Sequence, residues 1–116
     1  MGLDMRPSQA LRLWHEVTMA MVRDGDQDLT ARQMAILLTV YLEPPPHTVR
    51  GLASRLNVTK PVITRALDTL GAKKLLSRRR DEADRRNVVV TRTVAGALYL
   101  ESVGDIIVDK AATLGR

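Results

Sequence analysis

The chain contains no cysteine and no phenylalanine, and it has only one tryptophan and two tyrosines among its 116 residues. Without cysteine there are no disulfide bonds, no thiolate metal sites and no cysteine redox switch. With so few aromatic rings, a core has to be built from Leu, Val, Ile, Ala and Met. A hydrophobic content of 45% is enough for such a core.

Long apolar stretches are also missing. No run approaches the roughly 18 residues needed to span a bilayer. The first ten residues, MGLDMRPSQA, lack the apolar centre of a secretory signal. We therefore expect a cytoplasmic protein with no membrane partner. A length of 116 residues is typical of one domain, so we expect a single domain over residues 1–116.

What the chain does have is a local excess of positive charge. Residues 50–92 hold twelve Lys or Arg against four Asp or Glu, a net charge of +8. Residues 1–49 carry −2 and residues 93–116 carry −1. Dispersed charge would affect only solubility, but charge concentrated on one module is typical of a protein that binds a polyanion.

The spacing of apolar residues predicts two helices in the first part of the chain. Residues 8–22 form one amphipathic helix. A second helix begins after Thr30, because Thr30 and Gln33 can form a capping box. It ends near Leu42, before the three prolines at 44–46.

Two short helices follow with a tight turn between them, so residues 48–72 predict a helix-turn-helix. Thr48 and Thr59 are the expected N-caps of its two helices. Pro61 lies in the first turn of the second, where its missing N–H costs nothing. This fourth helix of the chain buries one arc and leaves the other polar.

The polar arc of the fourth helix carries groups that can read bases. Lys60 and Arg65 have the donors for guanine O6 and N7, and Thr64 can meet a base edge or a thymine methyl. Which of them touches a base stays open at this point. For Asp68 we expect an ion pair with Arg65, three residues earlier, with orientation of Arg65 for DNA or a contact with cytosine as the alternatives.

Residues 75–92 predict a short basic β-hairpin, or wing, with its tip at 81–84. Charge protects exposed strand edges, but like charges on adjacent strands repel unless something such as a phosphate backbone compensates them. Arg86, held by Asp84, is the best candidate for a narrow minor groove, with Arg85 as its competitor. The arginines of the wing are Arg78, Arg79, Arg80, Arg85 and Arg86.

Five short motifs follow one another in this part of the chain. They are Leu29-Thr30-x-x-Gln33, Leu52-Ala53-x-x-Leu56, Val58-Thr59-Lys60-x-Val62-x-Thr64-Arg65, Asp81-x-x-Asp84-Arg85-Arg86 and Thr93-x-x-Gly96. Each alone is weak, but the ordered set resembles the MarR family of bacterial transcriptional regulators. Two positions differ from the family pattern: Lys74 stands where Gly is usual, and Arg92 where Leu is usual.

The resemblance implies a mainly α (α+β) winged helix-turn-helix that binds double-stranded DNA as a homodimer at an inverted repeat, often as a repressor relieved by a small molecule. The helix of about residues 60–72 would enter the major groove and the wing arginines the minor groove. The protein would be associated with the nucleoid when bound to DNA. Candidate DNA-binding residues are Thr48, Arg50, Thr59, Lys60, Pro61, Thr64, Arg65, Arg78, Arg80, Asp84, Arg85 and Arg86.

The first helix (residues 8–22) and a last helix (94–114, capped by Thr93) carry apolar stripes that a small central module can hardly cover. Exposed patches of that size usually mark an interface. We therefore expect these to be dimerisation helices. The candidate interface residues are Leu11, Trp14, Val17, Met21, Leu98, Val103, Ile106 and Ile107.

Other binding sites find less support in the sequence. Trp14 and the methionines Met19, Met21 and Met34 could line a ligand pocket, but such residues more often pack between helices. A small-molecule effector is therefore compatible with the sequence without being indicated by it. The acids at 24–28 fail as a calcium loop, which needs Gly and Glu at two fixed positions.

Catalysis finds no support either. The two histidines are isolated from other metal ligands, and no nucleophile arrangement or phosphate loop occurs. We expect no enzyme, no metal and no cofactor. The main alternative to a DNA-binding regulator is a winged-helix module that binds another protein, since a fold does not fix a function. The charge of residues 50–92 argues against it, because such a module has no need of that charge.

Overall fold

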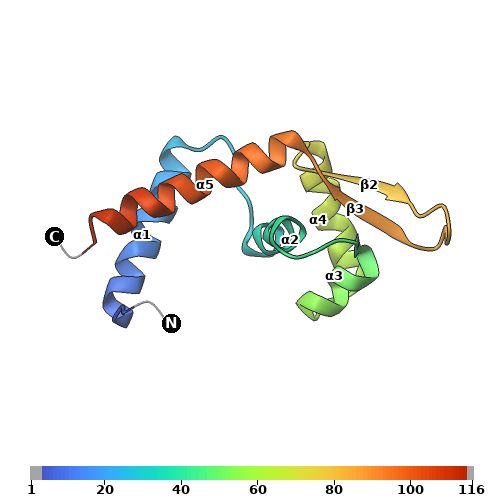
Figure 1. Cartoon of the computed structure of the whole chain (residues 1–116), viewed down its shortest axis with the longest axis horizontal. Helices are drawn as coiled ribbons and strands as arrows, with labels where there is room; N and C mark the ends of the chain where they lie inside the picture. The colour runs from blue at the N-terminus through green and yellow to red at the C-terminus, as the bar shows by residue number, and fades with distance from the viewer. Residues whose placement is uncertain (1–3, 115–116) are drawn as a thin grey trace. The chain divides into compact units, whose positions relative to one another are not determined.

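The computed structural model describes residues 4–114, which fall into two compact units. One unit is Leu29–Leu100, and the other comprises the residues before and after it. The predicted fold class is confirmed, with five helices and a small antiparallel sheet forming a mainly α winged helix-turn-helix. The elements in chain order (Figure 1) are α1 (Pro7–Asp24), α2 (Ala31–Leu42), β1 (His47–Thr48), α3 (Val49–Leu56), α4 (Lys60–Ala72), β2 (Leu76–Arg80), β3 (Val88–Arg92) and α5 (Val94–Ala112).

The helix starts follow local hydrogen-bonding chemistry, as the sequence predicts. The Thr30 hydroxyl accepts the backbone N–H of Gln33 at 3.1 Å, and the Gln33 side chain accepts that of Thr30 at 2.9 Å, which completes the capping box of α2. The Thr48 hydroxyl caps α3 by accepting the N–H of Gly51 at 2.9 Å. Thr59 is the N-cap residue of α4, but its side chain makes no capping hydrogen bond.

The turn between α3 and α4 depends on Asn57. This residue ends α3 in the left-handed conformation, with φ of 57° and ψ of 49°. Asn tolerates that conformation better than most residues with a side chain. The turn therefore needs only three residues before α4 begins.

The core of the Leu29–Leu100 unit is aliphatic, as the composition requires. Helices α2, α3 and α4 all contribute to it, and Leu76 and Val90 join the sheet to the helices. Its most deeply buried side chains are Ile36, Leu37, Val40, Leu52, Ile63, Leu67, Leu70 and Leu75.

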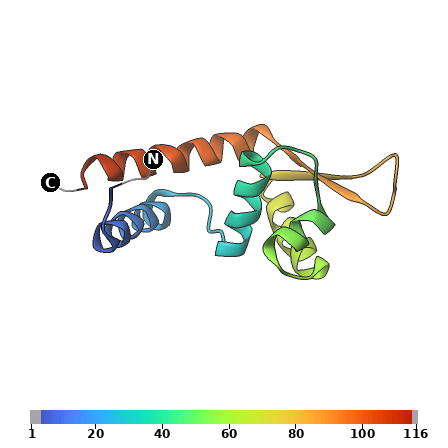
Figure 2. The ribbon, with the colours of Figure 1, turned by 60° about the horizontal axis from the view of Figure 1, so that its bottom comes forward.

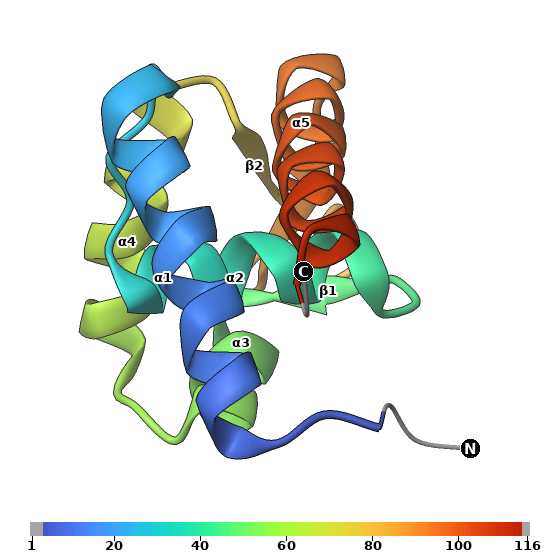
Figure 3. The same ribbon diagram turned by 90° about the vertical axis from the view of Figure 1, so that its left-hand side faces the viewer.

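The sheet contains a strand that the sequence does not predict. β1 has only two residues, His47 and Thr48, which pair with Val90 and Val89 of β3 (Figure 3). β3 also pairs with β2, so the strand order is β1-β3-β2 and all pairs are antiparallel. The β2–β3 hairpin extends away from α3 and α4 (Figure 2) and forms the predicted wing.

A polar junction lies where β3 passes into α5. The Tyr41 hydroxyl accepts the N–H of Thr93 at 2.9 Å, and the carbonyl oxygens of Thr93 and Leu75 both lie 3.0 Å from it. The Thr93 hydroxyl caps α5 by accepting the N–H of Gly96 at 3.0 Å, as predicted. A Cβ at Gly96 would collide with the Tyr41 hydroxyl and the Leu75 carbonyl, so only glycine fits there.

The two departures from the family pattern lie at the same junction. Lys74 has a φ of 62°, in the left-handed region that favours glycine. Arg92 donates from Nε to the Val40 carbonyl at 2.9 Å, and its guanidinium lies 5.8 Å from the centre of the Tyr41 ring. Arg92 therefore bonds to the end of α2 in place of an apolar contact.

The second unit contains α1 and the part of α5 that follows Leu100. The N–H of Arg6 bonds to the Gln9 side chain at 2.9 Å, and Pro7 opens α1, where it needs no hydrogen-bond donor. The helix is longer than predicted by one residue at its start and two at its end. Among residues 4–114, no helix is both long enough and apolar enough to cross a membrane.

Candidate nucleic-acid interface

The exposed arc of α4 is the first part of the candidate interface. Lys60, Pro61, Thr64 and Arg65 are all exposed, as the helical spacing predicts. The opposite arc is buried in the core, with Ile63, Ala66, Leu67 and Leu70. Packing therefore fixes the rotation of α4, so that its basic and hydroxyl groups face solvent.

The prediction for Asp68 is wrong. Its carboxylate does not pair with Arg65 on the same helix but lies 2.8 Å from Nη2 of Arg78 on β2. β2 packs against α4 through the buried Leu76, which brings Arg78 within reach. Spacing along one helix could not have revealed this contact, because it joins two elements.

At the tip of the wing, Asp84 holds Arg86 as predicted. The Arg86 guanidinium donates from Nε and Nη2 to the two carboxylate oxygens at 3.1 and 3.2 Å, and the Arg86 N–H donates to the same group at 3.1 Å. These bonds, first the side-chain pair and then the backbone one, hold the pKa of Asp84 below its usual value. The charge of Arg50 on α3 lowers it further, against a small opposing effect of desolvation.

The other wing arginines differ in what they contact. Arg80 donates from Nη1 to the carbonyl of Arg85 at 3.2 Å, across the hairpin. The N–H of Asp81 donates to the Asn87 carbonyl at 3.0 Å, which closes the tip. Within the described residues, no carboxylate or carbonyl accepts from the guanidinium groups of Arg79 and Arg85.

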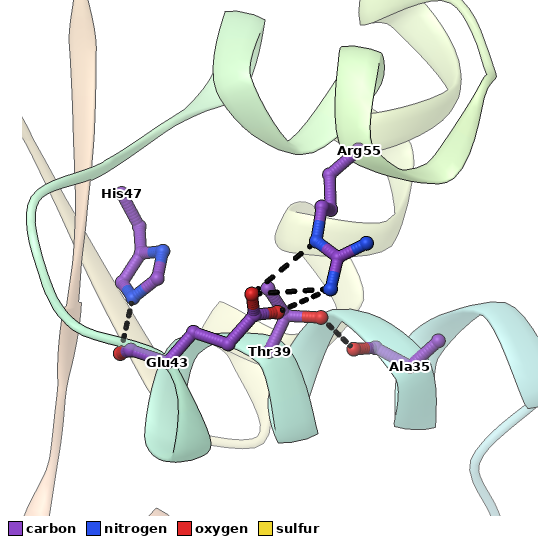
Figure 4. A network of polar contacts seen from close by, with 5 residues as sticks. All are labelled: Ala35, Thr39, Glu43, His47 and Arg55. Carbon is purple, nitrogen blue, oxygen red and sulfur yellow. Dashed lines mark hydrogen bonds and ion pairs between the residues drawn. The ribbon is translucent and has the colours of Figure 1, made fainter.

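A second ion pair, also missed by the sequence analysis, joins the end of α2 to α3 (Figure 4). Arg55 donates from Nε and Nη2 to the carboxylate of Glu43 at 3.1–3.3 Å. The Glu43 carbonyl lies 3.0 Å from Nε2 of His47, which carries the proton in that bond. These residues line a hollow of about 240 Å³ beside Thr48, the cap of α3. Glu43 and Arg55 are twelve residues apart, and neither belongs to a motif that would mark them.

The candidate interface residues on α1 and α5 divide into two groups. Val17 and Val103 are buried, at 1% and 9% exposure, so they offer little surface to a partner. This corrects the expectation that they belong to an interface between chains. Met21 and Ile106 are half-buried. The exposed candidates are Leu11, Trp14, Leu98 and Ile107.

The predicted ligand-pocket residues do not gather in one place. Met19 lines a hollow of about 330 Å³ between α1 and the end of α5, where most of the lining is charged, with Arg12, Glu16 and Asp109 among it. Met34 belongs to the other unit. Among residues 4–114, no group of three or more His, Cys, Asp or Glu side chains could hold a metal ion.

A helix-turn-helix with an antiparallel hairpin beside it defines a winged-helix protein. A sequence model of the MarR family matches residues 29–88, more than half of the chain. The chain therefore belongs to the MarR family, whose members are transcription regulators rather than enzymes.

Solved structures show the same fold. The transcriptional regulator Tm0710 from Thermotoga maritima is 26% identical over 90% of this chain and 71% of its own, with a TM-score of 0.74. A mutant of S. aureus MepR bound to an oligodeoxyribonucleotide is 26% identical over 96% of this chain and 83% of its own, with a TM-score of 0.75. The YusO protein from Bacillus subtilis, 23% identical over 90% and 72% with a TM-score of 0.74, is similar in fold. No curated protein sequence matches the chain.

Proposed function

We propose that this chain is a sequence-specific regulator of transcription that binds double-stranded DNA and acts as a repressor. One observation carries the proposal. The exposed arc of α4 and the projecting wing belong to one compact unit, and both lie within the segment of net charge +8. A concentrated positive surface beside a helix of major-groove size is what a DNA duplex requires of its partner.

In this proposal α4 lies in the major groove, and Lys60, Thr64 and Arg65 face base edges. The wing follows the backbone, and Arg86 enters the minor groove. The bound oligodeoxyribonucleotide of the S. aureus MepR mutant, which has the same fold, supports DNA as the partner. Further proposed DNA-facing residues are Thr48, Arg50, Thr59, Pro61, Arg78, Arg80, Asp84 and Arg85.

We further propose that residues 1–116 act as one functional module and that two copies form a homodimer through α1 and α5. Their exposed apolar side chains, Leu11, Trp14, Leu98 and Ile107, are unusual for surfaces in contact with water alone. Two-fold symmetry places two recognition helices about one DNA turn apart, roughly 34–36 Å, and requires an inverted repeat. In the cell, such a protein is located at the nucleoid.

Selection of bound fragments from genomic DNA tests the proposal and yields the site at the same time. We expect enriched fragments to share an inverted repeat with half-sites one turn apart. Enrichment without any shared sequence would contradict sequence-specific reading. No enrichment over an unrelated protein would favour the alternative, a winged-helix module whose partner is another protein.

A further inference from the structure

Arg78 of β2 and Asp68 of α4 connect the wing directly to the proposed recognition helix. Arg78 lies on the inner face of β2, because Leu76, two residues before it, is buried and its cross-strand partner Val90 is buried as well. From that face its guanidinium reaches the Asp68 carboxylate at 2.8 Å. The two side chains are 34% and 61% exposed, so the pair lies at the edge of the core, where water still reaches both groups.

The other arginines of the wing do not make such a contact. Arg80 bonds to the carbonyl of Arg85, and Arg86 bonds to Asp84, so both stay within the hairpin. Among the described residues, the guanidinium groups of Arg79 and Arg85 have no protein acceptor in an ion pair or hydrogen bond. Arg78 is thus the wing arginine whose partner belongs to α4.

Asp68 poses an electrostatic problem in a surface that binds DNA. It is exposed on α4 one turn after Thr64 and Arg65, where a free carboxylate repels phosphate. Arg78 neutralises this charge. The same bond takes the guanidinium of Arg78 away from any phosphate, because a group that is already bonded must give up that partner to bind another.

We infer that Arg78 is a positioning residue, which acts on DNA through Asp68 and makes no contact of its own with phosphate or base. The pair holds the wing in register with α4, so that the helix and Arg86 meet their two grooves in one geometry. This role rests on the proposed DNA-binding function and changes the part that Arg78 plays in it. An exposed pair of this kind shifts an equilibrium by roughly twofold to fivefold.

Three variants test the inference in the full chain: Asp68→Asn, Arg78→Met and the double variant, which keeps the net charge. Affinity for the selected site is measured by fluorescence anisotropy at several salt concentrations. We expect each variant to bind roughly twofold to fivefold more weakly, with losses that do not add, because each change opens the same pair. The double variant should keep the wild-type dependence on salt, because no phosphate contact is lost.

The behaviour of Asp68→Asn separates positioning from simple electrostatics. Removing an acid from a DNA-facing surface should strengthen binding unless that acid is needed for the geometry. Glu82→Gln is the matched control, because Glu82 is an exposed wing acid without a contact to α4. We expect this control to bind at least as tightly as the wild type. Arg85→Met is the control for a phosphate contact, with a slope of log K against log salt about 0.9 smaller.

Two results would overturn the inference. One is that Asp68→Asn binds more tightly than the wild type while the double variant loses about 0.9 in slope, as Arg85→Met does. Arg78 would then contact phosphate itself. The other is that none of the three variants changes the affinity. If the wild-type protein binds no DNA at all while its circular dichroism shows a folded chain, the proposed function fails instead, and the two failures are distinguishable.

Discussion

The hydroxyl of Tyr41, on α2, accepts the backbone N–H of Thr93, at the start of α5, across a distance of 2.9 Å. The carbonyl oxygen of Leu75, just after α4, lies 3.0 Å from the same hydroxyl. Three segments that are far apart in the sequence therefore meet at one oxygen atom. A buried or half-buried donor that loses its partner costs more than the bond itself gained, so this hydroxyl is a sensitive point of the fold.

Replacing Tyr41 by Phe removes the hydroxyl and leaves the ring. We expect the free energy of unfolding, measured by urea denaturation, to fall by about 1–3 kcal/mol, because the Thr93 N–H then has no acceptor. Thr69→Val is a suitable control, since the Thr69 hydroxyl bonds only to the Arg65 carbonyl within α4. A control effect within about 0.5 kcal/mol is expected. Equal effects of the two variants would show that the junction contributes nothing special.

The dependence of DNA affinity on salt tests the electrostatic part of the proposed function. Each phosphate contact contributes about 0.9 to the slope of log K against log salt. A dimer with around ten contacts should therefore lose orders of magnitude in affinity between low and moderate salt. Fluorescence anisotropy on the selected site measures this slope. A slope near zero would exclude binding through the basic surface of residues 50–92.

Variants of α4 and of the wing should differ in specificity. Alanine at Lys60, Thr64 or Arg65 should cost about 1–3 kcal/mol per lost base contact, and mainly on the specific site. Arg86→Ala should weaken binding wherever the flanking minor groove is narrow, with less effect of the central bases. Parallel titrations on specific and random DNA make the comparison. Equal losses on both for all three α4 variants would show that α4 does not read sequence.

The carboxyl group of Asp84 should titrate below the usual range for aspartate. Its hydrogen bonds to Arg86 favour the ionised form, so its pKa is lowered in the folded protein. The fork between the two residues is therefore intact at neutral pH and is lost as the pH falls through the lowered pKa. Carboxyl carbon shifts in an NMR titration measure the midpoint. Arg86→Met should return it toward the usual value, and an unchanged midpoint would contradict the assignment.

The assembly can be tested with the exposed apolar residues of the terminal helices. Light scattering at micromolar concentration should find a dimer, and Trp14→Glu or Leu98→Glu should shift it toward the monomer, because a charge at an interface core is costly. Leu42→Glu is the matched control, since Leu42 is also exposed but lies on α2. A monomeric wild type, together with selected sites that lack inverted repeats, would rule out the dimer.

The sequence predicts those parts of the fold that depend on neighbouring residues. The capping box of Thr30 and Gln33, the cap at Thr48 and the fork of Asp84 and Arg86 each involve partners within three residues, and all three are confirmed. Helical periodicity likewise predicts the buried arc of α4, because one period repeats several times within the helix.

The contacts that the sequence does not predict join residues that are far apart along the chain. The strand β1 is too short to show an alternation, and it exists only because β3 offers it a partner. The pairs Asp68–Arg78 and Glu43–Arg55 depend on how elements pack, so spacing alone favours a wrong partner for Asp68. Lys74 occupies a left-handed position where its side chain is unfavourable, which no local pattern would predict.

Gly96 limits which sequences can adopt this fold at all. Two groups occupy the place of its missing Cβ, and one of them, the Leu75 carbonyl, belongs to the main chain. Shortening Tyr41 would remove one obstruction, but no substitution can remove the other. A library randomised at positions 41 and 96 should therefore return variety at the first position and only glycine at the second.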